Sequence, residues 1–130
     1  MTAQIILKPW GREIILTTPD SPYTAKILEI KAGKRFSLQY HDQKIETLTL
    51  ISGEINITQG ENQEKLIVEK MLPETGYTIF PKTIHRLEAI SDARVFEAST
   101  PEQGTTFRLE DDESRPNETD EIRNLPNRGY

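Results

Sequence analysis

The residues best suited to chemistry are the only two histidines of the chain and the polar side chains around them. Gln39 and His41 stand two positions apart at the end of the strand-like run FSLQYH. Since side chains alternate between the two faces of an extended strand, Gln39 and His41 should project from the same side. We interpret the segment HDQKIE as a short turn, after which Glu46 opens the next antiparallel strand and directs its carboxylate toward the same point.

We expect His85 to reach this point from a separate strand. Pro81 should end the run YTIF, and a new strand should begin near His85. In a small closed barrel the inner faces of these strands would meet. An amide oxygen, two imidazoles and a carboxylate suit a divalent ion, with Zn preferred and Mn, Fe, Ni or Co as alternatives. Coordination positions left open would be available to substrate oxygens.

The composition limits the other classes of function. The chain has 130 residues, a net charge of -5 and no cysteine, which fits one domain without disulfides or thiolate ligands. Residues 101–130 hold eight acidic and four basic side chains, so most of the negative charge lies in this tail. The chain lacks the basic face that nucleic-acid binding requires, and its N-terminal apolar run is too short for a membrane span. We therefore expect a cytoplasmic protein with neither type of partner.

Apolar alternation in short runs predicts an all-β sandwich or barrel. Examples are TAKILEI, TLTLISGEINIT and RVFEA, separated by clusters of Gly, Pro, Asn and Asp. Ser52 and Gly53 read as a hairpin turn between neighbouring antiparallel strands, and QGENQE reads as another. We expect a barrel over residues 1–100, including an N-terminal strand, and an irregular acidic C-terminal arm over residues 101–130.

These residues resemble known motifs. The spacing of Gly33, Gln39, His41, Glu46 and Gly53 resembles the first motif of the cupin superfamily, with Gln in place of its first His. With the segments KPWGRE, TAKILEI and EDDESR, the chain is similar to the cupin domain of mannose-6-phosphate isomerases, in the version found at the C-terminus of bifunctional mannose-1-phosphate guanylyltransferases. The second motif departs from the family pattern, because GYTIFPKTIH is one residue short on each side of its proline and lacks the inner glycine.

The resemblance implies a cupin double-stranded β-helix, also called a jelly roll, that holds a metal through Gln39, His41, Glu46 and His85. It implies aldose to ketose isomerisation of a phosphorylated sugar, as in mannose-6-phosphate isomerase. The ion would polarise the substrate carbonyl, and a carboxylate or lysine would move a proton between C1 and C2, with a hydride shift as the alternative.

Three further residues are candidates for catalysis. Lys26 lies in the middle of a strand, where a buried ammonium needs an anionic partner, so it either faces outward or contacts the substrate. Glu97 could point inward as a base, although an exposed strand glutamate is more common. Arg115 matches an arginine of the family that reaches over the barrel mouth, but it could also simply offset Asp111 and Asp112.

Alternatives from other classes remain open. A cupin that binds a sugar or small anion without transforming it is the second reading, and an iron-dependent oxygenase is the third. We also expect a homodimer, because the apolar start IILKPWGREIIL could pair with the sheet of a second subunit.

Overall fold

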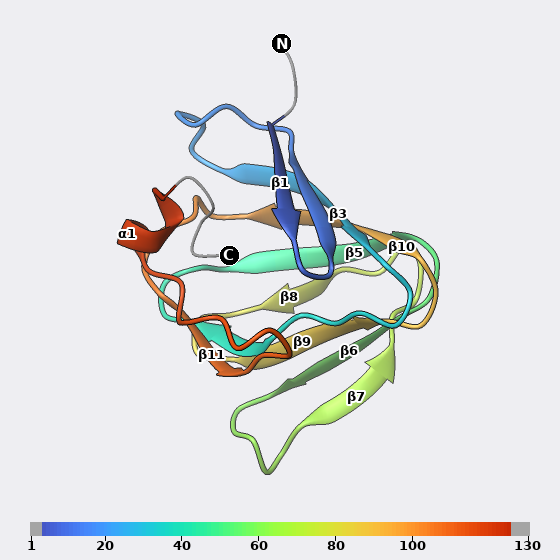
Figure 1. Cartoon of the computed structure of the whole chain (residues 1–130). Coiled ribbons are helices and arrows are strands. Elements are labelled where there is room, and N and C mark those ends of the chain that lie inside the picture. Colours follow the sequence, from blue (N-terminus) through green and yellow to red (C-terminus); the bar gives the residue numbers. More distant parts are fainter. Residues whose placement is uncertain (1–3, 126–130) are drawn as a thin grey trace.

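The chain folds into two antiparallel β-sheets that face one another (Figure 1). The computed structural model describes residues 4–125, so the first three residues of the predicted barrel and the last five of the predicted arm lie outside it. The described elements are β1 (Gln4–Lys8), β2 (Gly11–Ile15), β3 (Thr24–Ile30), β4 (Leu38–His41), β5 (Glu46–Ser52), β6 (Ile55–Gly60), β7 (Ile67–Lys70), β8 (Tyr77–Ile79), β9 (Ile84–Ala89), β10 (Ala93–Ser99), β11 (Thr106–Glu110) and α1 (Asp120–Arg123). The predicted all-β jelly-roll class is confirmed.

Strands that are distant in sequence lie side by side in both sheets. The larger sheet has the order β1-β2-β3-β10-β5-β8, and the smaller has the order β11-β4-β9-β6-β7. Consecutive strands β4 and β5 therefore belong to opposite sheets. The core between the sheets can thus receive side chains from both of them.

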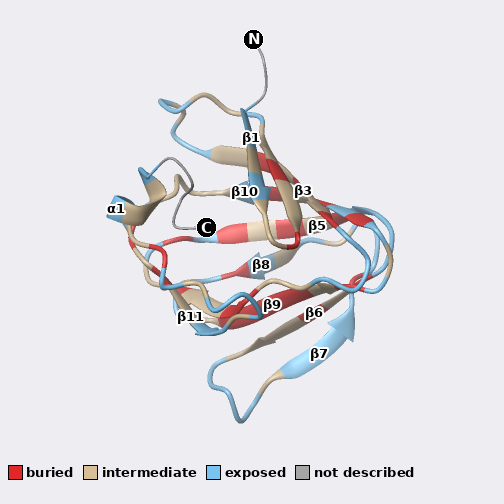
Figure 2. Ribbon diagram, viewed as in Figure 1, coloured by how far each residue is buried: buried red, intermediate tan, exposed pale blue. Residues whose placement is uncertain are grey.

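Alternation along each strand decides which side chains enter this core. In β3 the buried positions are Lys26, Leu28 and Ile30, and the residues between them are only partly buried. β9 is buried at five of its six positions, whereas the edge strand β7 is exposed throughout (Figure 2). The apolar core consists of side chains from both sheets, with Trp10 packed against Phe36 at a ring-centroid distance of 4.4 Å.

The turn at Ser52 and Gly53 is not a hairpin within one sheet, so that prediction was wrong. β5 and β6 on either side of it lie in different sheets. The turn before Glu46 also joins the two sheets. Glu46 opens a strand as predicted, but β4 pairs with β9 and β11 and not with β5. The predicted hairpin at QGENQE is confirmed, because β6 and β7 are paired antiparallel neighbours.

The C-terminal segment contributes to the barrel. Residues 106–110 form β11, which pairs with β4, and Thr106 also bridges to Glu118 further along the chain. The single turn of α1 follows, with the Thr119 side chain accepting a hydrogen bond from Ile122 N. Within residues 4–125 no helix is both long and apolar enough to cross a membrane. The cytoplasmic location stays a prediction.

Candidate metal centre

His41, Glu46 and His85 meet between the two sheets. His41 ends β4 and His85 is the second residue of β9, so the adjacent strands of the smaller sheet supply both imidazoles. Glu46, the first residue of β5, reaches toward them from the larger sheet. Their candidate ligand atoms all lie within 4.8 Å of one another, and all three residues are buried. The structure therefore brings together a His–Glu–His group that could hold a metal ion.

The orientation of both imidazoles suits an ion. His41 Nε2 is 3.7 Å from Glu46 Oε2, and His85 Nε2 is 3.3 Å from Glu46 Oε1. Both Nε2 atoms are buried without a hydrogen-bond partner among the described residues. The other ring nitrogens are anchored: His85 Nδ1 donates to Thr83 O at 2.9 Å, and His41 Nδ1 lies 2.8 Å from Thr106 Oγ1. Anchoring of Nδ1 leaves each Nε2 directed inward, as in many metal sites.

The charges of the site favour ligand forms that bind cations. Burial lowers the pKa of His41 to about 3, and the nearby Lys44 ammonium acts in the same direction, so this imidazole stays neutral at pH 7. Burial alone would raise the pKa of Glu46, but Lys44 and His85 hold it well below its ordinary value. A neutral imidazole and an ionised carboxylate are the forms that coordinate divalent ions.

Gln39 lies in the same region. It stands directly opposite His85 in the register of β4 and β9, and it lines the cavity that His41 and Glu46 also line. Its Oε1 accepts a hydrogen bond from Ser37 Oγ at 2.5 Å. Gln39 is therefore placed to act as a further oxygen ligand beside the three buried groups, and its role as a ligand stays a prediction.

Buried charged side chains surround this group. Lys26 is 1% exposed and its Nζ lies 2.9 Å from Glu13 Oε1, with Glu102 Oε1 in closer contact. Burial alone would lower the pKa of Lys26, but its carboxylate neighbours raise it above its ordinary value. Lys26 therefore faces inward with anionic partners, which excludes the outward-facing alternative.

Glu97 also points inward, next to a lysine that sequence reasoning missed. Lys44 Nζ is 2.9 Å from Glu97 Oε2 and 3.0 Å from Glu46 Oε2, and both Lys44 and Glu97 are buried. Burial raises the pKa of Glu97 even though Lys44 acts against this. One signal in the sequence could have indicated Lys44: it lies two positions before Glu46, the spacing that places two side chains on the same face of an extended chain.

Arg115 is paired with an acidic residue of its own segment. Its Nε and Nη2 each donate to the Asp111 carboxylate at 3.0 Å, and both side chains are largely buried. Arg115 also lines the cavity of the histidine site. The structure thus combines the two readings of the sequence: Arg115 offsets Asp111 and lies at the cavity wall, while any contact with substrate stays a prediction.

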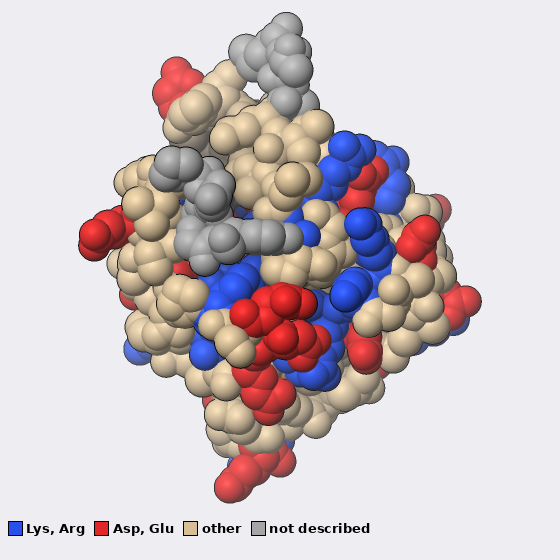
Figure 3. All heavy atoms as spheres, in the orientation of Figure 1, with Lys and Arg blue, Asp and Glu red and all other residues tan. Residues whose placement is uncertain are grey.

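The cavity beside the His–Glu–His group is small. Its volume is about 50 Å³ and its wall includes Lys26, Lys44, Glu97 and Glu102. This volume holds about one or two water molecules. Figure 3 shows basic and acidic side chains interspersed over one face of the molecule. A sugar phosphate could enter only if part of the wall moved.

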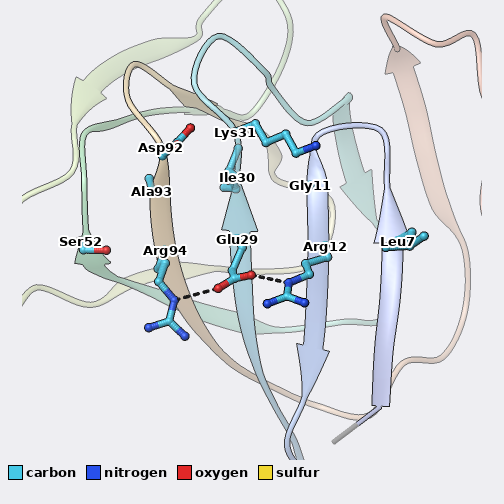
Figure 4. Close-up of a pocket in the computed structure, with 10 residues that line it drawn as sticks. All are labelled: Leu7, Gly11, Arg12, Glu29, Ile30, Lys31, Ser52, Asp92, Ala93 and Arg94. Carbon is cyan, nitrogen blue, oxygen red and sulfur yellow. Dashed lines mark hydrogen bonds and ion pairs between the residues drawn. The ribbon is translucent and has the colours of Figure 1, made fainter.

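A larger hollow lies elsewhere, on the outward face of the larger sheet (Figure 4). It has a volume of about 460 Å³, and Glu29 of β3 lies there between Arg12 of β2 and Arg94 of β10. Glu29 faces away from the core because it alternates with the buried Leu28 and Ile30. This hollow contains no histidine and is separate from the site predicted from the sequence.

The two facing sheets and the buried His–Glu–His group define a β-barrel of the cupin class. A family model described as "Mannose-6-phosphate isomerase C-terminal" matches residues 1–115. The chain belongs to this family, as the resemblance of its motifs indicated.

One curated relative matches part of the chain. It is the mannose-1-phosphate guanylyltransferase RfbM of Salmonella typhimurium, 29% identical over 86 residues that cover 65% of this chain and 16% of RfbM. The chain therefore spans only a small part of that relative's length.

Solved structures support the fold. The capsular polysaccharide assembling protein CapF of Staphylococcus aureus has a TM-score of 0.72 at 17% identity, covering 85% of this chain and 32% of the CapF chain. The oxalate decarboxylase of Bacillus subtilis, a protein with Mn(II) centres, has a TM-score of 0.67 at 13% identity, covering 82% of this chain and 30% of the decarboxylase chain. At these identities the likeness shows the shared fold alone.

Proposed function

We propose that the chain is a metal-dependent aldose–ketose isomerase that acts on a phosphorylated sugar, similar to mannose-6-phosphate isomerase. The observation that supports this most is the combination of the family match over residues 1–115 with a buried His–Glu–His group facing a cavity. The orphaned Nε2 atoms and the ionised Glu46 fit a divalent ion. Zn is the first choice, with Mn, Fe, Ni or Co as alternatives.

In this proposal His41, Glu46 and His85 would hold the ion, with Gln39 as a fourth ligand. The ion would supply Lewis-acid stabilisation of the negative charge that develops on the substrate oxygen. The proton would be carried between the two carbons by a buried side chain of the cavity wall. Glu97 suits this task better than Lys26, because burial raises the pKa of the Glu97 carboxyl above its ordinary value and so strengthens it as a proton acceptor. Lys26, whose pKa is raised, stays protonated.

An assay with the Glu97→Gln variant tests the role of this carboxyl. We expect metal-loaded wild-type protein to interconvert mannose-6-phosphate and fructose-6-phosphate. Glu97→Gln should retain the ion but lose at least about a hundredfold in kcat, the range typical of general acid–base catalysis. Turnover that survives in Glu97→Gln would contradict the assignment. Absence of isomerisation by the metal-loaded wild type, across a panel of aldose phosphates, would contradict the function itself.

A second candidate is a cupin that binds a sugar or small anion without transforming it, and the small cavity favours the small anion. About 50 Å³ is enough for a small ligand group but not for a whole sugar phosphate. Calorimetry that shows binding of an aldose phosphate without isomerisation would support this second function.

A further inference from the structure

Glu102 is held by cations from three separate elements. Its Oε1 contacts Lys26 Nζ of β3 closely and lies 3.2 Å from Lys44 Nζ, and its Oε2 lies 3.3 Å from Arg123 Nε of α1. Lys26 and Lys44 are nearly inaccessible to solvent, whereas the Glu102 side chain is 20% exposed. The carboxylate therefore closes the outer side of a pair of buried ammonium groups.

Glu102 differs from the other carboxylates of the cavity in its place in the fold. Glu13, Glu46 and Glu97 lie on strands β2, β5 and β10, where ladder hydrogen bonds fix their backbone. The backbone of Glu118 is fixed by two hydrogen bonds to that of Thr106. Glu102 lies in the loop between β10 and β11, a loop anchored at its two ends by Thr100 N to Ile45 O (3.0 Å) and Asp42 N to Thr105 O (3.2 Å). Glu102 is thus the one of these five carboxylates that can leave the cavity without breaking a sheet or the bridge to Thr106.

The net charge of the cavity wall becomes more positive when Glu102 leaves, which favours binding of an anion. Arg115 is neutralised by Asp111, so the remaining charged side chains of the wall are four cations and five carboxylates. They are Lys8, Lys26, Lys44, Arg108, Glu13, Glu46, Glu97, Glu102 and Glu118. Their net charge is -1, and it would be +1 with a divalent ion bound. Moving Glu102 outward would raise the latter value to +2, and Arg123, which now contacts Glu102, would add a further positive charge beside the site.

We infer that Glu102 occupies an anion site, and that this site takes the phosphoryl group of a ligand when the Glu102 loop moves outward. Lys26, Lys44 and Arg123, which now contact the carboxylate, would then contact phosphoryl oxygens. Departure of the side chain would also enlarge a cavity that is otherwise too small for a sugar phosphate. The inference deepens the proposed function and rests on it in assigning the phosphoryl group to a sugar.

Two variants with the same change in charge test whether Glu102 itself fills the anion site or whether any loss of negative charge beside Lys26 has the same effect. Glu102→Gln and Glu13→Gln each remove one carboxylate charge from the partners of Lys26. Glu102 lies in the loop between β10 and β11, whereas Glu13 lies on strand β2. With inorganic phosphate as the probe, calorimetry should show at least tenfold tighter binding to Glu102→Gln than to wild type. Glu13→Gln should change the dissociation constant by less than about threefold. Glu102→Ala, which also vacates the space, should bind at least as tightly as Glu102→Gln.

Further arms of the experiment identify the ligand and exclude misfolding. Mannose-6-phosphate should show the same ordering of variants, while mannose, which lacks the phosphoryl group, should show no difference between them. Each variant is checked for a cooperative thermal transition and for metal content equal to wild type. Equal tightening in Glu102→Gln and Glu13→Gln, or tightening in none of the Glu102 variants, would overturn the inference. Since phosphate binding requires no turnover, this result is independent of whether the protein isomerises sugars.

Discussion

At the scale of single residues, the candidate site combines groups that the sequence indicated with groups it did not. Gln39 and His41 could be predicted because they share one face of an extended strand. Glu46 followed from the turn before the next strand, and His85 followed from the strand break at Pro81. For Lys26 and Glu97 the sequence left the inward and outward orientations open, and Lys44 was missed, because a charged residue in or beside a strand is usually exposed. Whether such a residue is buried depends on partners contributed by other strands, and the sequence does not show which strands are neighbours.

Lys44 allows a direct test of the electrostatics of this site. Its ammonium, 3.0 Å from Glu46 Oε2, competes with any cation for that carboxylate. Lys44→Met should therefore bind a divalent ion at least about tenfold more tightly, a gain of about 1.4 kcal/mol. Without metal it should lose about 3–5 kcal/mol of unfolding free energy, because Glu97 and Glu46 lose a buried partner.

Lys26→Met is the matched control for Lys44→Met, since Lys26 is equally buried but contacts Glu13 and Glu102 instead of Glu46. It should lose similar stability without the gain in metal affinity. Titration with a competing chelator gives the affinity, and urea unfolding gives the stability. Equal metal affinities in the two variants would show that Lys44 does not compete for the site.

The hydroxyl of Thr106 offers a second test, because it lies 2.8 Å from His41 Nδ1 and helps to orient the ring. Thr106→Val keeps the shape of the side chain and removes this contact. We expect metal affinity to fall about 10–100-fold, the usual effect of losing a partner that orients a metal ligand. The control is Thr47→Val, which removes a surface contact to Thr78 and should leave metal affinity unchanged. An unchanged affinity in Thr106→Val would exclude this role of the hydroxyl.

At the scale of elements, the strands were easier to predict than their partners. The run TAKILEI corresponds to β3, and a new strand begins near His85 as expected. The turn at Gly53 was assigned to a hairpin because a short Gly-containing connection is typical of one. In the structure it joins the two sheets instead, and whether a short turn stays in one sheet or crosses to another depends on packing between sheets, which local sequence does not report.

Gly53 should be much less tolerant of substitution than another glycine of similar conformation. Its φ is 87°, and a Cβ there would lie 2.3 Å from Asp92 O. Gly33 has a φ of 79° with nothing within 4 Å of the corresponding position. We expect Gly33→Ala to lower the unfolding free energy by about 1 kcal/mol and Gly53→Ala by about 3 kcal/mol, because only the latter adds a clash. Thermal or urea unfolding measures both, and equal losses would contradict the crossing geometry of this turn.

The exposed edge of the larger sheet supports the expected homodimer, which we propose. Among the strands of residues 4–125, β1 pairs only with β2, and its side chains Ile5 and Leu7 are 51% and 70% exposed. Pairing with a second copy would cover both the open edge and this apolar surface. Sedimentation should give twice the chain mass for wild type and the monomer mass for Leu7→Lys. The control is Ile67→Lys on β7, the edge strand of the smaller sheet, which should keep the dimer mass. A monomeric wild type would contradict the proposal.

At the scale of the whole molecule, the fold explains how residues far apart in sequence serve one site. Two sheets facing each other place β4 and β9 opposite β5, so the imidazoles and the carboxylate approach from opposite sides. The C-terminal segment then closes one end: β11 extends the smaller sheet, and Arg123 of α1 contacts both Glu102 and Glu118. The acidic composition of residues 101–130 predicted an irregular arm, but it could not show that this arm would carry a strand and part of the cavity wall.

The metal content of the purified protein tests the central claim most directly. Elemental analysis after gel filtration should find one equivalent of a divalent ion per wild-type chain. His85→Ala should contain none while keeping a cooperative thermal transition, and Arg94→Ala, at the separate hollow on the outer face of the larger sheet, should keep its ion. A wild-type chain that stays metal-free after incubation with Zn, Mn, Fe, Ni and Co salts, or a His85→Ala variant that retains its ion, would contradict the assignment of the His–Glu–His group as a metal centre.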